Sequence, residues 1–263
     1  MAPYHLHYQV YGQGPLVLLA FHGFGQDASV FANFSAAFPG YTIYSIDLFF
    51  HGRSQWHGPL DGLTQAKWQE ILQRFLTDQA IANFGLIGYS MGGRLALVTC
   101  QCFPAQVQQL VLMAPDGIRP HAWYRLATRV PALHGMFRYV TAENPNSFHW
   151  LVLTMRHWQL LPRTLLKIAE TQMSQPALRA RVYRTWMLFR QLEPDLVQIA
   201  QLLNQRRVPV QIFTGQHDTV VKPTDMRSLI RRLDRGQHTI LACGHGQLLK
   251  EVLKWLMGNH FPG

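Results

Sequence analysis

Residues 84–103 of this chain read FGLIGYSMGGRLALVTCQCF, and the pattern within this stretch decides the fold. A short apolar run precedes Ser90, which is typical of a strand buried on both faces, and residues 91–103 have the composition of a helix. Gly88 and Gly92 flank the serine in the pattern G-x-S-x-G and permit a sharp turn from strand to helix. Such a turn lifts the Ser90 hydroxyl above the sheet, at a helix N-terminus that favours developing negative charge.

The alternation of strand and helix continues on both sides of this stretch. Apolar or alternating runs that predict strands lie at residues 4–11, 16–21, 42–46, 110–114, 208–213 and 238–242. Stretches that predict helices lie at residues 27–38, 64–82, 224–233 and 247–256. Strands that alternate with helices indicate an α/β fold, in which a mostly parallel sheet carries helices on both faces.

The middle of the chain, residues 119–205, breaks this alternation. It contains no strand-like run, and prolines divide its helical stretches. We therefore predict a core formed by residues 1–118 and 206–263. Residues 119–205 are predicted to be inserted between two strands as an all-helical cap, and not as an independent domain. An insertion at this point is expected to cover the carboxyl ends of the strands, where ligands bind in open α/β sheets.

The net charge of +10 is concentrated in the same part of the chain. Residues 119–207 hold thirteen basic and four acidic side chains, whereas the rest of the chain holds eleven basic and ten acidic ones. Because the charge is local, we expect no nucleic-acid partner. The basic segment instead suits an anionic substrate, because guanidinium groups bind carboxylate and phosphate bidentately. An acidic carrier protein or an anionic membrane surface is the alternative partner.

The overall composition excludes several classes of protein. An apolar share of 48% and a charged share of 14% exclude an intrinsically disordered chain. No apolar run approaches the about 18 residues of a membrane span, and the N-terminus lacks the basic cluster of a signal peptide. Cys100, Cys102 and Cys243 lack the spacing of a metal site and fit reduced thiols. The sequence therefore predicts a cytoplasmic protein with no metal site and no cofactor.

With these motifs the chain resembles the α/β-hydrolase family of serine hydrolases. The resemblance covers nearly everything outside the middle segment, and it implies an oxyanion-binding loop after the first long buried strand. The sequence His22-Gly23-Phe24-Gly25 lies there, so the backbone N–H groups of Phe24 and Met91 are expected to form the oxyanion hole. Residues Asp47 to Ser54 resemble another element of the family, an acidic residue followed by a His-Gly turn. Asp47 comes too early in the chain to be the catalytic acid, so a structural role is expected for this element.

The family order of serine, acid and histidine implies the rest of the catalytic triad. Asp218 follows the fifth buried strand and resembles the family's acid, and His245 follows the last strand and resembles its base. A serine hydroxyl needs a neighbouring imidazole to remove its proton, and the imidazole needs a carboxylate to hold its tautomer. Asp116, which follows the fourth strand, is the alternative acid, because some members of the family take the acid from that position.

Three functions are compatible with this site. The first is hydrolysis of an ester, thioester or C–C bond in a small acyl or carboxylate-bearing substrate, with a carboxylic ester favoured. The second is a lyase reaction, because the elbow from Gly88 to Arg94 looks like that of menaquinone-pathway enzymes, whose elbow arginine Arg94 matches. Tyr89 and Arg94 are expected to bind substrate. The third is an esterase or binding protein that docks an acidic carrier protein, as in the related pimeloyl-carrier-protein methyl esterases, or an anionic membrane, on its basic cap.

Overall fold

The computed structural model describes residues 3–119, 122–139, 144 and 175–259. Contacts between residues divide the chain into two compact units, a core unit and a second unit. The core unit consists of Met1–His57, Thr64–Arg119 and Leu192–Gly263, and the second unit of Gly58–Leu63 and Pro120–Gln191. The cap was expected at residues 119–205; Leu192–Gln205 lie with the core unit by this division. Residues 145–174 of the expected cap lie outside the described residues.

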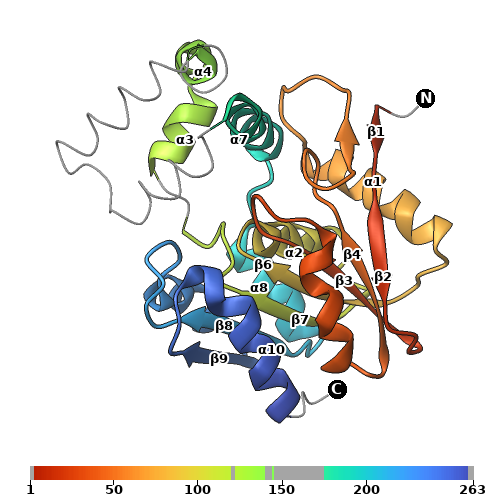
Figure 1. Ribbon diagram of the computed structural model, residues 1–263. Helices are drawn as coiled ribbons and strands as arrows, with labels where there is room; N and C mark the ends of the chain where they lie inside the picture. The colour runs from red at the N-terminus through yellow and green to blue at the C-terminus, as the bar shows by residue number, and fades with distance from the viewer. Residues whose placement is uncertain (1–2, 120–121, 140–143, 145–174, 260–263) are drawn as a thin grey trace. The chain divides into compact units, whose positions relative to one another are not determined.

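A seven-stranded sheet forms the centre of the core unit (Figure 1). Its strands, in spatial order, are β2 (Tyr8–Tyr11), β4 (Tyr41–Ile46), β3 (Leu16–Phe21), β6 (Phe84–Tyr89), β7 (Val107–Met113), β8 (Val210–Gly215) and β9 (Gly236–Leu241). Strand β2 is antiparallel to β4, and all the other neighbours are parallel. Two short strands, β1 (Tyr4–His5) and β5 (Gln55–Trp56), pair separately. The predicted α/β fold with a mostly parallel sheet is thereby confirmed.

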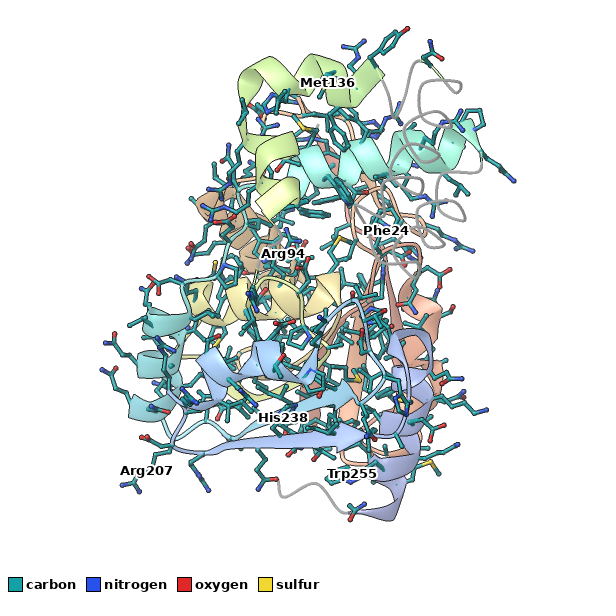
Figure 2. The ribbon with its side chains drawn as sticks, turned by 90° about the vertical axis from the view of Figure 1, so that its left-hand side faces the viewer. Phe24, Arg94, Met136, Arg207, His238 and Trp255 are labelled. Carbon is teal, nitrogen blue, oxygen red and sulfur yellow. The ribbon has the colours of Figure 1, made fainter. Side chains whose placement is uncertain are left out.

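Helices cover both faces of this sheet. On one face lie α1 (Gln65–Asp78), α2 (Met91–Cys102) and α8 (Leu196–Gln205), which contact one another through α2. On the other face lie the 3₁₀ helix η1 (Ala28–Ala36) and α10 (Leu248–Gly258), which also contact each other. Trp255 of α10, labelled in Figure 2, meets Phe213 of β8 edge to face at 5.0 Å between ring centroids. Because helices cover both faces of the sheet, polar groups are expected at the ends of the strands and in the loops that follow them.

Helix α1 shows how the apolar pattern sets the packing. Thr64 caps its N-terminus by accepting a hydrogen bond from the backbone of Lys67 at 3.2 Å. One stripe of the helix is buried, and its members are Trp68, Ile71, Leu72, Phe75 and Leu76. The Trp68 indole N–H donates to the hydroxyl of Thr99 on α2 at 3.0 Å, so the largest side chain of the stripe is also satisfied as a donor.

Two predicted helices have a different form in the structure. The stretch expected as a helix at residues 27–38 is the 3₁₀ helix η1, which begins after the cap residue Asp27. Its Val, Phe, Asn and Ser residues are weak helix formers, which accounts for the tighter and less regular winding. The stretch at residues 224–233 is divided into the 3₁₀ turn η3 (Pro223–Met226) and the single turn α9 (Arg227–Ile230).

The described part of the second unit is helical except at Gly58–Leu63 and in the short connecting segments. It contains α3 (Ala122–Arg129), α4 (Pro131–Arg138) and α7 (Pro176–Phe189). An aromatic cluster links the three helices, with Phe137 of α4 stacked on Trp186 of α7 at 5.5 Å and Tyr124 of α3 at the edge of Trp186 at 5.4 Å. Among the described residues, no helix has both the length and the apolar character needed to cross a membrane.

Candidate active site

Ser90 lies at the turn between β6 and α2, in a backbone conformation that few residues adopt. Its φ is +52° and its ψ is −117°, so a non-glycine residue occupies the strained region that presents a side chain outward from a sharp turn. The flanking glycines are sterically required. A Cβ at Gly92 would lie 2.0 Å from the carbonyl oxygen of Phe21, and one at Gly88 would lie 2.6 Å from the carbonyl oxygen of Gly92. The motif therefore folds as the sequence predicts, with the serine side chain at the carboxyl end of the sheet.

His245 and Asp218 reach the same point from the ends of the next strands. Asp218 lies in the turn after β8, and His245 begins the 3₁₀ turn η4 (His245–Gln247) after β9. The Nε2 atom of His245 is 3.1 Å from the Ser90 hydroxyl oxygen, and its Nδ1 atom is 2.6 Å from an oxygen of the Asp218 carboxylate. The structure thus brings together, in one hydrogen-bonded chain, three residues separated by up to 155 positions.

Hydrogen bonds hold Asp218 so that one of its carboxylate oxygens faces the imidazole. Its Oδ1 atom accepts hydrogen bonds from the backbone N–H groups of Val220 and Val221 at 2.8 and 2.9 Å, which leaves Oδ2 directed at His245. Its side chain is fully buried, whereas that of His245 is 19% exposed. A carboxylate that accepts from Nδ1 fixes the tautomer in which Nε2 carries the lone pair. That lone pair faces the Ser90 hydroxyl, which is the arrangement a general base needs.

The alternative acid, Asp116, is engaged elsewhere. Its carboxylate pairs with the guanidinium of Arg94, and its Oδ1 atom accepts from the backbone of Gly117 at 2.7 Å. Arg94 lies on α2 (Figure 2), and its side chain is only 8% exposed. Arg94, which was expected to bind substrate, thus forms an ion pair with Asp116, whose side chain is 31% exposed.

The loop after β3 has the features of an oxyanion-binding loop. Gly25 adopts a φ of +79°, and the backbone N–H of Gly23 donates to the side-chain oxygen of Gln26 at 2.9 Å, so the loop is a closed turn. In the part of the chain that the structure describes, the N–H groups of Phe24 and Met91 donate to no backbone carbonyl in the turns, loops and caps. Two such donors are what a developing oxyanion requires.

His22, at the start of this loop, is fully buried and neutral. Its Nε2 atom accepts from the backbone N–H of Leu48 at 3.0 Å, so Nδ1 carries the proton and donates to the carbonyl of Gly23 at 2.7 Å. Burial lowers the pKa of His22 below its ordinary value, against the opposing effect of the Gly23 carbonyl. The imidazole thereby ties the oxyanion loop to the segment that follows β4.

Tyr89, which was expected to bind substrate, contacts His245. Its hydroxyl donates to the backbone carbonyl of His245 at 2.8 Å, and its ring stacks on the imidazole with centroids 5.2 Å apart. Only 4% of Tyr89 is exposed, and burial, with a smaller contribution from Asp218, raises the pKa of its hydroxyl far above the ordinary value. The hydroxyl therefore stays protonated and remains a donor.

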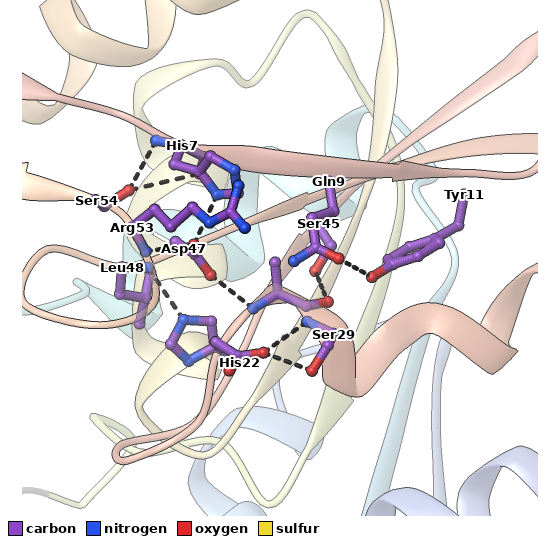
Figure 3. A network of polar contacts seen from close by, with 12 residues as sticks. His7, Gln9, Tyr11, His22, Ser29, Ser45, Asp47, Leu48, Arg53 and Ser54 are labelled. Carbon is purple, nitrogen blue, oxygen red and sulfur yellow. Dashed lines mark hydrogen bonds and ion pairs between the residues drawn. The ribbon is translucent and has the colours of Figure 1, made fainter.

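Asp47 is the centre of a structural network beside the oxyanion loop (Figure 3). One carboxylate oxygen accepts from the backbone of Ala28 at 2.7 Å, and the other accepts from the backbone of Arg53 at 2.8 Å and from Nδ1 of His7 at 2.7 Å. A Cβ at Gly52, where φ is +52°, would lie 2.1 Å from the carboxylate. These bonds join the segment between β1 and β2, η1 and the turn after β4, which supports the structural role expected for this element.

Sequence motifs do not single out Gln26, although its side chain closes the oxyanion loop. The available signal is a polar side chain three residues after Gly23 in a glycine-rich turn, where an oxygen can accept from the first backbone N–H. Likewise, no motif marks the Val220 and Val221 backbone donors behind Asp218. Among the described residues, no cluster of three or more His, Cys, Asp or Glu side chains could hold a metal ion.

Comparison with curated proteins finds relatives that share part of the chain. A stretch of 121 residues is 33% identical to lipase LipV of Mycobacterium tuberculosis and covers 43% of this chain and 44% of that protein. A stretch of 129 residues is 37% identical to the pimeloyl-[acyl-carrier protein] methyl ester esterase of Legionella pneumophila and covers 48% and 49%. The chain therefore spans about half the length of these relatives, or less.

Solved structures match over almost the whole chain. A thermophilic esterase from Thermogutta terrifontis superposes with a TM-score of 0.67 at 18% identity and covers 96% of this chain and 90% of that one. The enol-lactonase from Burkholderia xenovorans LB400 superposes with a TM-score of 0.64 at 18% identity and covers 96% and 94%. The family model of the alpha/beta hydrolase fold matches residues 16–252, and the chain belongs to this family.

Proposed function

We propose that this protein is a serine hydrolase that cleaves a carboxylic ester, with Ser90 as nucleophile, His245 as general base and Asp218 as the orienting acid. One observation carries the proposal: the Ser90 hydroxyl is 3.1 Å from Nε2 of His245, and the other imidazole nitrogen is 2.6 Å from a fully buried carboxylate. A serine hydroxyl is a weak nucleophile until a base removes its proton, and this arrangement places such a base beside Ser90.

The geometry corresponds to a two-step acyl transfer. The Ser90 proton moves to Nε2 of His245 while the oxygen attacks the ester carbonyl, and the resulting oxyanion accepts from the N–H groups of Phe24 and Met91. When this intermediate collapses, the leaving alcohol takes the proton from His245 and the acyl group stays on Ser90. Water then attacks the acyl-serine and gives a proton to the same imidazole. When this second intermediate collapses, the imidazole returns the proton to the Ser90 oxygen, and the carboxylic acid is released.

The contacts of Arg94 favour hydrolysis over the lyase reaction. A lyase of the type considered would use elbow arginines to bind substrate carboxylates, whereas the Arg94 guanidinium is buried and paired with Asp116. The curated relatives include proteins named as a lipase and as methyl ester esterases, which supports an ester as the bond that is cleaved.

The charge of the second unit supports an anionic group in the substrate or its carrier. Its described residues carry seven arginines and one acidic residue, Asp61. The exposed arginines among them are Arg125, Arg129, Arg138 and Arg184. A carboxylate on the acyl group, or an acidic carrier protein, would be attracted by this charge. The names of three relatives include an acyl-carrier protein.

Hydrolysis of p-nitrophenyl esters of graded acyl length tests the proposal. The wild-type protein is expected to release p-nitrophenol well above the buffer rate, and Ser90→Ala is expected to show no turnover. Ser228→Ala, which changes an exposed serine in η3–α9, is the control and should match the wild type. Equal rates for the wild type and Ser90→Ala would overturn the proposed function.

A further inference from the structure

Tyr89 contacts both His245 and the oxyanion loop after β3. On one side, its hydroxyl donates to the His245 carbonyl at 2.8 Å, and its ring lies 5.2 Å from the imidazole at an interplanar angle of 30°. On the other side, the ring packs against the oxyanion loop: a Cβ at Gly23 would lie 3.0 Å from the ring atoms Cδ1 and Cε1. Only a glycine at position 23 therefore fits beside this ring without displacement.

The segment that carries His245 needs an external support. His245 has a glycine on each side, Gly244 and Gly246, and it belongs to a 3₁₀ turn of only three residues. Glycines leave the backbone many accessible conformations, so the local sequence alone does not hold the imidazole in one place. Asp218 and Ser90 contact the two ring nitrogens, and the backbone N–H of Leu248 donates to the His245 carbonyl, but these bonds do not by themselves fix the plane of the ring.

We propose that Tyr89 is a positioning residue that locks the His245 backbone and ring plane to the nucleophile elbow and sets the spacing between His245 and the oxyanion loop. This inference rests on the proposed function, since it assigns Tyr89 a role in the same reaction. Because Tyr89 directly precedes Ser90, the same rigid turn that presents the nucleophile also holds its base and the Gly23 end of the loop that carries Phe24. Burial raises the pKa of this hydroxyl above its ordinary value, so the hydroxyl remains a donor to the His245 carbonyl.

A positioning residue and a substrate-binding residue affect different kinetic constants. Loss of a positioning contact lowers kcat and leaves KM nearly unchanged, because the substrate is still bound but the reacting atoms are misaligned. Loss of a substrate contact raises KM. Tyr89→Phe removes only the hydroxyl and keeps the stacked ring, whereas Tyr89→Leu removes both.

Steady-state kinetics with a p-nitrophenyl ester, together with thermal unfolding, form the first test. Tyr89→Phe is expected to lower kcat about three- to tenfold, the range that the loss of one net hydrogen bond supports, and Tyr89→Leu about 100-fold, as for a misplacement of about 1 Å. Tyr11→Phe is the matched control, because it removes a hydroxyl that donates to Gln9 on strand β2, and it should leave kcat unchanged. A raised KM at unchanged kcat in Tyr89→Phe, or kinetics equal to the wild type, would overturn the inference.

Proton NMR of the substrate-free protein provides a readout that does not depend on turnover. The Nδ1 proton of His245, bonded to Asp218, is expected as a low-field resonance that is absent in His245→Ala. In Tyr89→Phe this resonance should broaden or disappear through faster exchange with water, while in Tyr11→Phe it should persist. An unaltered resonance in Tyr89→Phe contradicts the positioning role. If the wild type hydrolyses no ester and this resonance still depends on Tyr89, the proposed function fails and the positioning contact stands.

Discussion

At the scale of single residues, two aspartates at the ends of neighbouring strands have different partners, and the difference decides their chemistry. Asp218 receives two backbone N–H groups on one oxygen and the His245 imidazole on the other. Asp116 receives the guanidinium of Arg94 and the N–H of Gly117. A carboxylate that already neutralises an arginine cannot orient a histidine that it does not contact.

Amide substitutions at these two positions should therefore have different effects. Asp218→Asn is expected to lower kcat about 10⁴-fold, because the amide stabilises the wrong imidazole tautomer. Asp116→Asn should keep kcat within about tenfold of the wild type and lower the free energy of unfolding by about 1–3 kcal/mol, since it removes the carboxylate that pairs with the buried guanidinium of Arg94. Kinetics and urea unfolding of both variants measure this. An inactive Asp116→Asn that unfolds like the wild type would contradict the assignment of the acid.

At the scale of secondary-structure elements, the close approach of α2 to β3 positions the serine. A Cβ at Gly92 would meet three backbone atoms, the carbonyl oxygen and carbon of Phe21 and the carbonyl oxygen of His22, all within 2.6 Å. Backbone atoms of a central strand cannot move away as a flexible side chain can. This contact therefore couples the elbow to the oxyanion loop.

Gly92→Ala tests that coupling against a helical glycine in open space. We expect Gly92→Ala to lower kcat at least about 100-fold and to destabilise the protein by about 2 kcal/mol or more, because α2 must shift away from β3. In Gly135→Ala, a new Cβ on α4 meets nothing within 4 Å, so this variant should keep full activity and gain up to about 1 kcal/mol of stability. Activity and thermal unfolding of the pair measure both effects. Full activity in Gly92→Ala would show that the close contact between α2 and β3 does not determine the geometry of the site.

Motif order and strand context predicted the elbow and the positions of Asp218 and His245, because these features depend on local turns at strand ends. They could not predict the partners of Tyr89 and Arg94, since those contacts depend on where distant chain segments meet: Tyr89 and His245 are 156 positions apart. The 3₁₀ form of η1 was also missed, because apolar spacing alone does not distinguish a 3₁₀ from an α-helix in a short segment.

At the scale of the whole molecule, buried histidines link stability to pH. Burial holds the pKa of His22 below 6.5, so the folded protein keeps this imidazole neutral at pH values where the unfolded chain protonates it. The unfolded state then binds more protons, and the free energy of unfolding decreases as the pH falls below about 6.5. The stabilising contribution is fully present above that pH.

Urea unfolding between pH 7.5 and pH 5 measures this effect. The wild type should lose stability in this range with a contribution from His22 of up to about 1.4 kcal/mol per pH unit. His22→Asn, which keeps a donor for the Gly23 carbonyl and cannot titrate, should be less stable at pH 7.5 and should show a weaker pH dependence. If both proteins lose stability in parallel, His22 is not responsible for the loss.

The charge distribution of the molecule predicts how salt acts on substrate binding. The described arginines of the second unit are expected to attract an anionic acyl group, and added salt screens such attraction, since the Debye length falls from about 10 Å at 0.1 M to about 3 Å at 1 M. The KM of a carboxylate-bearing ester should therefore rise with ionic strength, while the KM of a neutral ester of equal length should not. Equal salt dependence of the two esters would remove the argument for an anionic substrate.

Covalent labelling with a fluorophosphonate, followed by mass spectrometry of the peptides, tests the central claim most directly. The account predicts a single adduct on Ser90 in the wild type, no adduct in Ser90→Ala, and much slower labelling in Asp218→Asn and His245→Ala, because the reagent reacts only with a serine activated by its base. An unlabelled wild-type protein, or an adduct on another serine that persists in Ser90→Ala, would contradict it.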